Sequence, residues 1–409
     1  MKETKVSANF KWVVMALVTL SIIPVSYCSF QVSALPVEFM TALGIDGVQF
    51  TSILTASMLP GVFFAIIGGV LADKIGPKKT CAFALIVSLV GSLGRLVANS
   101  YGMYLVFMIM LGFGGTFLSL CSVKLFSAWF EPEQLGIPMG VMMSSGALGT
   151  AIAQSTTAAL FSGKLGAAYI AGSVWIGIML VLWILIIKEK PEGAPDFPPM
   201  PVLEGLKKAL KSKNVWVIGL CAALSMGYQM IFNSNYIAGL TAAKGIDATV
   251  AGLYGTLLTV GGFLGNIVVP SLCKKIGVNK PSILLFAVLG GLLSYVAWTM
   301  CDGFAMAILM ALGGFFAFGC IPPLMGYPAL LDEIGPMNAG SAAGLVTTVQ
   351  MLGAFFLPSS VFAPLATTDG VMNFSTLFLY GALCSVLMGV VALLLPELGT
   401  KALAKRNNQ

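Results

Sequence analysis

Long apolar segments make up most of this sequence, and few kinds of fold are compatible with them. Twelve runs of roughly 20 residues, rich in Leu, Val, Ala, Met, Phe and Gly, follow one another along the chain. A helix needs about 20 apolar residues to cross a bilayer core. Only 9% of the residues are charged and 58% are hydrophobic, whereas soluble domains carry about 25% charged residues. The sequence therefore excludes an ordinary water-soluble fold and predicts an all-α integral membrane protein with twelve transmembrane helices.

The predicted spans are joined by short loops, with one long polar interruption. Their approximate bounds are 12–36, 50–70, 80–98, 102–127, 137–161, 167–188, 215–237, 249–271, 281–300, 303–327, 339–364 and 372–395. Between the sixth and seventh, Lys188 to Lys213 is rich in Pro and Lys, and its prolines oppose one continuous helix. Residues 203–210 favour a short amphipathic helix on the membrane surface. We expect a six-helix bundle over 1–188, a cytoplasmic linker over 189–213 and a second six-helix bundle over 214–409.

An internal repeat supports this division into halves. Gly136, Gly140 and Gly149 open the fifth predicted span, and Gly340, Gly344 and Gly353 open the eleventh, 204 residues later. Small residues at such spacings let helices approach closely in lipid. The pattern indicates two halves of the same construction.

The basic residues predict the orientation in the membrane. If both termini and the loop after the second span share one side, 18 of the 22 Lys and Arg residues fall on that side. Cytoplasmic loops carry an excess of Lys and Arg. We therefore expect both termini to be cytoplasmic, in a multi-pass protein of the cytoplasmic membrane.

The loop after the second predicted span carries the most specific motif. Residues 69–79 read Gly-Val-Leu-Ala-Asp-Lys-Ile-Gly-Pro-Lys-Lys, which predicts a tight, basic turn at a membrane face. The order G-x-L-A-D-K-x-G-x-K-K closely resembles the signature loop between the second and third helices of the major facilitator superfamily of secondary transporters.

The resemblance covers essentially the whole chain and implies a specific architecture. It implies two pseudo-symmetric six-helix bundles that work by alternating access, with substrate between them near the midplane. Gly69, Asp73, Gly76, Lys78 and Lys79 would then be gating residues. Asp73 would hold the halves together by facing the positive N-terminal end of a helix of the other half, near 338–342. The plainer alternative is a basic anchor that only fixes topology.

A second segment narrows the branch of the family. Residues 124–133 resemble the end of the fourth span in organic-anion members, of the oxalate–formate-exchanger-like or cyanate–nitrate-like kind. Ala128 stands where those members often carry an arginine, so the usual partner of Asp73 is missing. The fifth span lacks the Gly-Pro-x-x-Gly-Gly pattern of drug/proton antiporters. A small organic anion, in particular a carboxylate, is the implied substrate.

Ionisable residues are rare in the spans, so each one is a functional candidate. Lys124, in the fourth span, can attract an anionic substrate where water is scarce, or its amine can reach lipid headgroups. Arg95, near the external end of the third span, is a weaker candidate for the same role. Asp332 and Glu333, at the cytoplasmic end of the tenth span, form either a gate or a solvated loop end.

Polar side chains gather in the spans that the family plan places around the cavity. The predicted substrate contacts besides Lys124 are Tyr27, Gln31, Gln154, Tyr228, Asn233 and Gln350. Unsatisfied polar groups are costly in lipid, so these side chains either orient a polar ligand or bond between helices.

The coupling mode follows from what the sequence lacks. It has no histidine, and no Asp or Glu lies in the middle of a predicted span. We therefore expect anion exchange, or symport in which the proton travels with the carboxylate of the substrate.

Other classes of function find less support. The sequence has no P-loop, nucleophile–base pair or metal-ligand spacing, so we expect no enzyme activity, cofactor, metal or nucleic-acid partner. A neutral-solute or drug carrier of the same fold and a transporter-like sensor remain alternatives. The expected partners are the substrate, protons or a counter-anion, and the bilayer, around a monomer.

Overall fold

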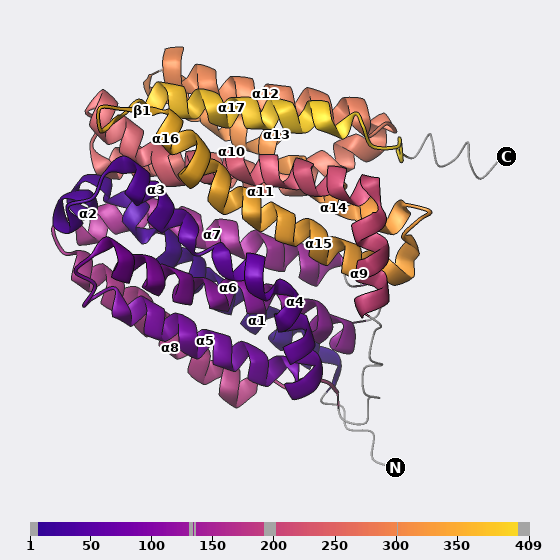
Figure 1. The fold of residues 1–409 in the computed structure, drawn as a ribbon. Coiled ribbons are helices and arrows are strands. Elements are labelled where there is room, and N and C mark those ends of the chain that lie inside the picture. The colour runs from indigo at the N-terminus through magenta and orange to yellow at the C-terminus, as the bar shows by residue number, and fades with distance from the viewer. Residues whose placement is uncertain (1–6, 131–133, 135, 192–201, 301, 400–409) are drawn as a thin grey trace.

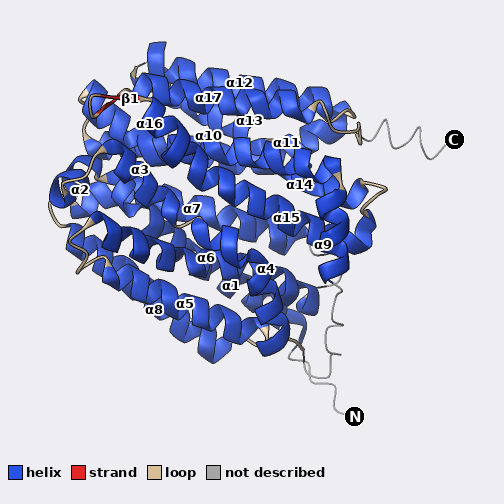
Figure 2. Ribbon diagram, in the orientation of Figure 1, coloured by secondary structure: helices blue, strands red, loops and turns tan. Residues whose placement is uncertain are grey.

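The computed structural model describes residues 7–130, 134, 136–191, 202–300 and 302–399. Within these ranges the side chains at 7–9, 65–70, 73, 136, 202–204 and 336–339 lie outside the description. Helices make up almost all of the described chain (Figure 2). The described strands are the two-residue pair β1 (Thr367–Thr368) and β2 (Val371–Met372), paired antiparallel. The all-α prediction is confirmed.

The first half of the chain forms one group of helices. Its elements are α1 (Ser7–Phe30), the 3₁₀ turn η1 (Gln31–Ala34), α2 (Pro36–Leu43), α3 (Gly47–Ala56), α4 (Leu59–Ile75), α5 (Pro77–Gly94), α6 (Tyr101–Trp129), α7 (Gly136–Phe161) and α8 (Leu165–Ile186). One large apolar cluster at its centre joins side chains of α1, α5, α6 and α8, including Val18, Leu85, Leu118 and Trp183.

The second half repeats this construction. Its elements are α10 (Lys213–Lys244), α11 (Ala248–Ile276), α12 (Lys280–Met300), α13 (Gly303–Gly319), α14 (Ile321–Leu330), α15 (Gly335–Phe356), the π-helical turn η3 (Leu357–Phe362), α16 (Ala363–Leu365) and α17 (Phe374–Ala392). Figure 1 shows the two halves side by side. The helix α9 (Val202–Lys211) lies against α15 and α10 and confirms the short amphipathic helix predicted over 203–210. Its position on the membrane surface stays a prediction.

Nine helices of the described chain are long and apolar enough to cross a membrane. The other three predicted spans correspond to α3 with α4, to α5 and to α7. The second predicted span is interrupted at Ser57 and Met58, just before Pro60, and the tenth at Cys320, before two prolines. Proline has no backbone N–H, and the first N–H groups of a helix have no acceptor within that helix. Proline is therefore tolerated at the start of the helix that follows each break. The count of twelve stays a prediction.

The repeated glycines occupy equivalent places in the two halves. A Cβ atom on Gly149 of α7 would collide with the backbone of α1 around Ile23, and one on Gly353 of α15 would collide with Ala223 of α10. A Cβ atom on Gly140 or on Gly344 would meet nothing within 4 Å. The repeat thus marks two equivalent close helix contacts, as the spacing of small residues predicted.

The motif at 69–79 is more helical than the predicted turn. Helix α4 continues to Ile75 and α5 begins at Pro77, so the reversal takes place at Gly76, whose φ is +88°. This conformation favours glycine because it has no Cβ atom. The expected loop is therefore a one-residue turn between two helices.

Candidate transport pathway between the halves

The two ends of the helix bundle are named here by the short helices that lie beside them. We call the end beside α2 the α2 face and the opposite end, beside α9, the α9 face (Figure 1). Near the α2 face, α7 packs against α11, and η1, α2 and α3 pack against α10. Contacts between the halves are therefore extensive at this end.

A polar network joins the halves inside the α2 face. The Nε2 group of Gln154 on α7 donates to the backbone oxygen of Asn233 on α10 at 3.2 Å. The Thr259 hydroxyl on α11 lies 3.2 Å from both the Oε1 atom of Gln154 and the Oδ1 atom of Asn233. All three side chains are buried, with exposed fractions of 1%, 6% and 1% for Gln154, Asn233 and Thr259. The Thr259 hydroxyl, which also lies 3.1 Å from the backbone oxygen of Gly255, thus has amide oxygens of opposite halves within hydrogen-bond distance.

Two further contacts reinforce this network. The Thr51 hydroxyl on α3 donates to the Oδ1 atom of Asn235 on α10 at 2.7 Å. The Thr256 hydroxyl on α11 donates to the backbone oxygen of Ala151 on α7 at 3.2 Å. The backbones can approach here because a Cβ atom on Gly252 would collide with the backbone oxygen of Gln154. Closure at the α2 face therefore rests on glycine packing, on neutral hydrogen bonds and on an apolar cluster that includes Ala34 of η1 with Tyr228 and Ile237 of α10.

The other polar candidates lie inside one half each. Gln31 is buried, donates to the backbone oxygen of Ala168 at 2.7 Å and accepts from Arg95 at 3.1 Å. The Tyr27 ring packs on Trp175, with ring centroids 5.6 Å apart. In the second half, the Tyr228 hydroxyl shares a 2.5 Å hydrogen bond with the Ser294 hydroxyl. These three side chains make interhelical contacts in the structure.

Gln350 and Lys124 lie on α15 and α6. Gln350 is 6% exposed, and its neighbour Met351 packs where α15 meets Gly61 of α4. Lys124 is partly buried, five residues before α6 ends at Trp129 and therefore roughly one and a half turns from that end. It lies toward the α9 face. The described residues thus place Gln154 and Asn233 together, whereas Lys124 lies nearer the opposite end.

The signature motif contacts the start of the linker. The Lys78 backbone N–H donates to a carboxylate oxygen of Glu189 at 3.1 Å, and the Trp183 indole donates to the backbone oxygen of Lys78 at 3.0 Å. A carboxylate is favourable at a helix N-terminus, which here is that of α5. Lys79 is exposed. The side-chain surroundings of Gly69 and Asp73 lie outside the described residues, so the predicted contact of Asp73 stays a prediction.

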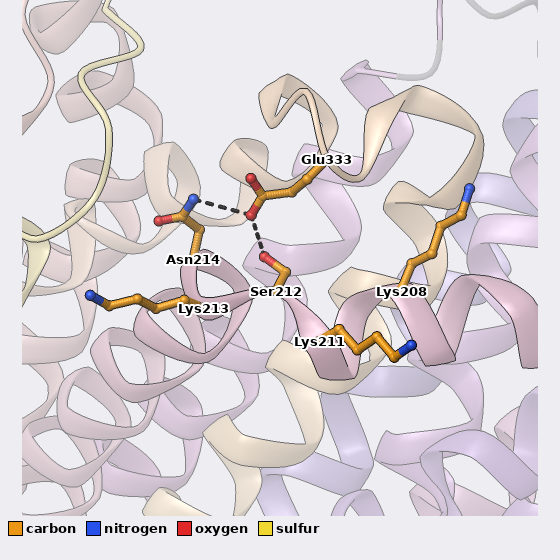
Figure 3. A pocket seen from close by; sticks show the side chains of 6 residues that line it. All are labelled: Lys208, Lys211, Ser212, Lys213, Asn214 and Glu333. Carbon is orange, nitrogen blue, oxygen red and sulfur yellow. Dashed lines mark hydrogen bonds between the residues drawn. The ribbon is translucent and has the colours of Figure 1, made fainter.

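The predicted acidic gate lies in the turn between α14 and α15. Both Asp332 and Glu333 are exposed. Glu333 accepts from the Ser212 hydroxyl at 2.5 Å and from the Asn214 amide at 3.1 Å, at the N-terminus of α10 (Figure 3). Lys208, Lys211 and Lys213 line the same cavity of about 480 Å³. Through these hydrogen bonds, Glu333 ties this turn to α10 within the second half.

Sequence reasoning missed several residues of these contacts. Thr51, Thr256, Thr259 and Glu189 were not among the candidates, although Asn233 and Gln154 were. The sequence of α11 could have indicated this contact, because small and polar residues recur there at helical spacing. They are Gly252, Gly255, Thr256 and Thr259, and they share one face of the helix.

Comparison with known proteins places this architecture among transporters. The relatives in sequence include a probable nitrate/nitrite antiporter NarK1 of Thermus thermophilus, 24% identical over 90% of this chain and 88% of that protein. Others are a hexuronate transporter of Bacillus subtilis, 26% identical over 76% and 78%, and a probable sulfoacetate transporter SauU of Cupriavidus necator, 23% identical over 75% and 76%.

Solved structures share the fold. The nucleoside transporter NupG aligns with a TM-score of 0.71 and 14% identity over 94% of this chain and 98% of that one. A bacterial homologue of the human lysosomal transporter Spinster, inward-facing and unoccupied, aligns with a TM-score of 0.68 and 14% identity over 95% and 96%. The family model of the Major Facilitator Superfamily matches residues 16–358. This multi-pass membrane protein belongs to the Major Facilitator Superfamily and is a transporter rather than an enzyme.

Proposed function

We propose that this transporter carries a small organic anion, a carboxylate, along the interface between its two halves. The observation that carries the proposal is the polar network of Gln154, Asn233 and Thr259, which joins the halves through neutral groups. Such an interface can open and close without separating a buried ion pair, whose cost would be high. The sequence relatives named above are described as transporters of nitrate or nitrite, hexuronate and sulfoacetate, which are all anions.

Alternating access assigns different tasks to the two faces. The α2 face is joined by hydrogen bonds between the halves, and these bonds must break when the pathway opens there. Lysines are concentrated at the α9 face, on α9 and at the start of α10. By the positive-inside rule this face is cytoplasmic in our proposal. The α2 face would then open to the outside of the cytoplasmic membrane, around a monomeric carrier.

Lys124 is the proposed electrostatic partner of the anion. It lies on α6, in the part of the pathway nearer the α9 face, and is only partly buried. A charge in a site with little water attracts an anion more strongly than it would in bulk water. Lys124 would bind the carboxylate in its part of the pathway, and the amides of Gln350 and Gln154 would contact the molecule at other stages of its passage, Gln154 nearer the α2 face.

The coupling mode in this proposal is exchange or proton symport. The predicted spans hold no Asp or Glu near their middle, and the chain has no histidine. A proton would then cross with the carboxylate of the substrate, or a second anion would return in exchange.

An inorganic oxyanion is the second candidate substrate. The relative described as a nitrate/nitrite antiporter aligns over 90% of this chain. One lysine can bind nitrate as well as a carboxylate, because both present oxygens that share a single negative charge.

The first test is thermal unfolding of the purified protein with a panel of small carboxylates and with nitrate. A ligand that binds the folded state stabilises it by RT ln(1 + [L]/Kd), so even weak binders register at high concentration. The wild type is compared with Lys124→Gln. The matched control is Lys244→Gln, which makes the same charge change on α10 near the α2 face, where Lys244 lies 4.0 Å from an exposed Asp302.

The proposal predicts stabilisation by one class of carboxylate, lost in Lys124→Gln and kept in Lys244→Gln. Equal stabilisation of all three proteins would remove Lys124 from the site. Stabilisation by nitrate alone that is lost in Lys124→Gln would favour the second candidate. A response to neutral or cationic compounds only would reject the anion proposal.

A further inference from the structure

A buried arginine lies inside the first half, away from the network between the halves. Arg95 follows α5 directly and is 2% exposed. Its guanidinium donates to the backbone oxygens of Cys28 at 2.7 Å and Ser92 at 3.3 Å. It also donates to Gln31 at 3.1 Å and to the Ser92 hydroxyl at 2.9 Å. All four acceptors are neutral.

The charge of this arginine is therefore not balanced by its hydrogen-bond partners. A guanidinium has five N–H donors and stays protonated in proteins. The four bonds leave one N–H, on Nη1, for another partner. The Tyr169 ring, 4.5 Å from Cζ of Arg95, contributes a cation–π contact but no negative charge. Buried charges are normally paired because leaving water is costly.

A cavity of about 180 Å³ adjoins this guanidinium. Its lining includes Phe39 and Leu43 of α2, Arg95 and Leu96 after α5, Tyr104 of α6 and Tyr169 of α8. Tyr104 is 1% exposed, and its hydroxyl lies near the Arg95 guanidinium and the Tyr169 hydroxyl but makes no well-formed hydrogen bond to either. A buried hydroxyl without a well-formed hydrogen bond is unusual and destabilising. The cavity thus adjoins a cation whose hydrogen-bond acceptors are all neutral and a buried hydroxyl without a well-formed hydrogen bond.

We propose that this cavity binds a small monovalent anion of the size of formate or nitrate. The remaining N–H of Arg95 and the O–H of Tyr104 would both donate to it, because hydrogen bonds to an ionised acceptor are the stronger kind. Phe39, Leu43 and Leu96 form an apolar wall, so a strongly hydrated anion is disfavoured.

Two charged residues directly precede residues that line the cavity: Glu38, whose charge opposes anion binding, and Lys164, whose charge favours it. The carboxylate of Glu38 is held by the Gly163 N–H at 3.0 Å and by the Ser162 hydroxyl at 3.0 Å. Lys164 is exposed and directly precedes Leu165, which lines the cavity. A bound anion would connect α2, α6 and α8 to Arg95, whose other bonds hold the end of α1. This site is separate from the proposed transport pathway and stands or falls independently of it.

The test uses the full-length protein in detergent, titrated with sodium formate and with sodium nitrate. Sodium gluconate, whose anion is bulkier and carries more hydroxyl groups than formate or nitrate, keeps the ionic strength constant. Binding is followed by calorimetry and by the midpoint of thermal unfolding. The variant Tyr104→Phe removes this buried hydroxyl at almost unchanged volume. Tyr101→Phe is the matched control, since it makes the same change on α6 at a side chain that does not line the cavity. Lys124→Gln is tested in parallel.

We expect saturable binding in the wild type, Tyr101→Phe and Lys124→Gln, with Kd at least roughly tenfold weaker in Tyr104→Phe. Without anion, Tyr104→Phe should unfold at the same or a higher temperature than the wild type, because it buries no hydroxyl that lacks a well-formed hydrogen bond. Equal affinity in Tyr104→Phe and wild type would overturn the proposal. So would binding that depends on Lys124 alone, or a wild type that neither anion stabilises.

Discussion

Replacing Gln154 by alanine should open the α2 face. The change removes the hydrogen bond from Nε2 to the backbone oxygen of Asn233 and the Oε1 acceptor of Thr259, both at 3.2 Å. Each buried neutral hydrogen bond contributes about 1 kcal/mol. Losing one or two bonds between the halves costs the closed state about 1–2 kcal/mol, which corresponds to a factor of roughly 5–30 in an equilibrium constant.

The assay measures how often this face opens. Ala34 on η1 is fully buried in an apolar cluster with residues of the second half, such as Tyr228 and Ile237. A cysteine placed there reacts with a membrane-impermeant thiol reagent only when the halves separate. The seven native cysteines of the described chain are buried, and Cys301 is replaced by serine in the parent. We expect Gln154→Ala to raise the labelling rate of this cysteine by roughly 5–30-fold.

The control is Gln31→Ala. Gln31 is equally buried and also makes one donated and one accepted hydrogen bond, but both partners belong to its own half. This variant should lose stability without a matching rise in labelling. If Gln154→Ala labels at the parental rate, or if both variants label equally fast, the network does not hold the face closed and our reasoning is wrong.

Two further substitutions test the fold around the pathway. Gly353→Ala would place its Cβ atom 2.5 Å from Ala223, so we expect the free energy of unfolding to fall by about 1–3 kcal/mol. Gly344→Ala, which has open space around the new Cβ atom, should be tolerated. The midpoints of thermal unfolding of the two variants are compared. In Gly76→Ala, alanine would have to adopt the φ of +88° found at this position, and its Cβ atom would collide with the Glu189 carboxylate. We therefore expect this variant to fold poorly, which is measured as a lower yield of monodisperse protein. A wild-type yield would contradict the one-residue turn.

The helical class could be predicted from the sequence because lipid allows few alternatives. Backbone groups in a bilayer must be satisfied within a segment, so long apolar runs become helices. The equivalence of Gly149 and Gly353 followed from their spacing, and the structure places both at close contacts between helices. The amphipathic α9 was also predictable, from the pattern of leucine and lysine over 203–210.

The pairing across the interface could not be predicted in the same way. Thr51 and Asn235 are 184 residues apart, and Gln154 and Thr259 are 105 apart. A sequence shows which side chains are polar, but packing of whole helices decides which of them meet. The same limit explains Glu189, which looked like part of a polar linker and instead lies at the N-terminus of α5.

The breaks within spans were missed for a related reason. Prolines near Ser57 and Cys320 signalled a disturbance, yet a proline can either kink a helix or start a new one. Here a new helix begins after each break, at Leu59 and at Ile321.

The most direct test of the central claim is uptake of a labelled small carboxylate into proteoliposomes that contain the purified protein. Our account predicts saturable uptake that an internal carboxylate or an inward proton gradient accelerates, and that Lys124→Gln reduces while Lys244→Gln does not. Uptake of a neutral solute in place of every carboxylate tested, or carboxylate uptake that is the same in Lys124→Gln, would contradict it.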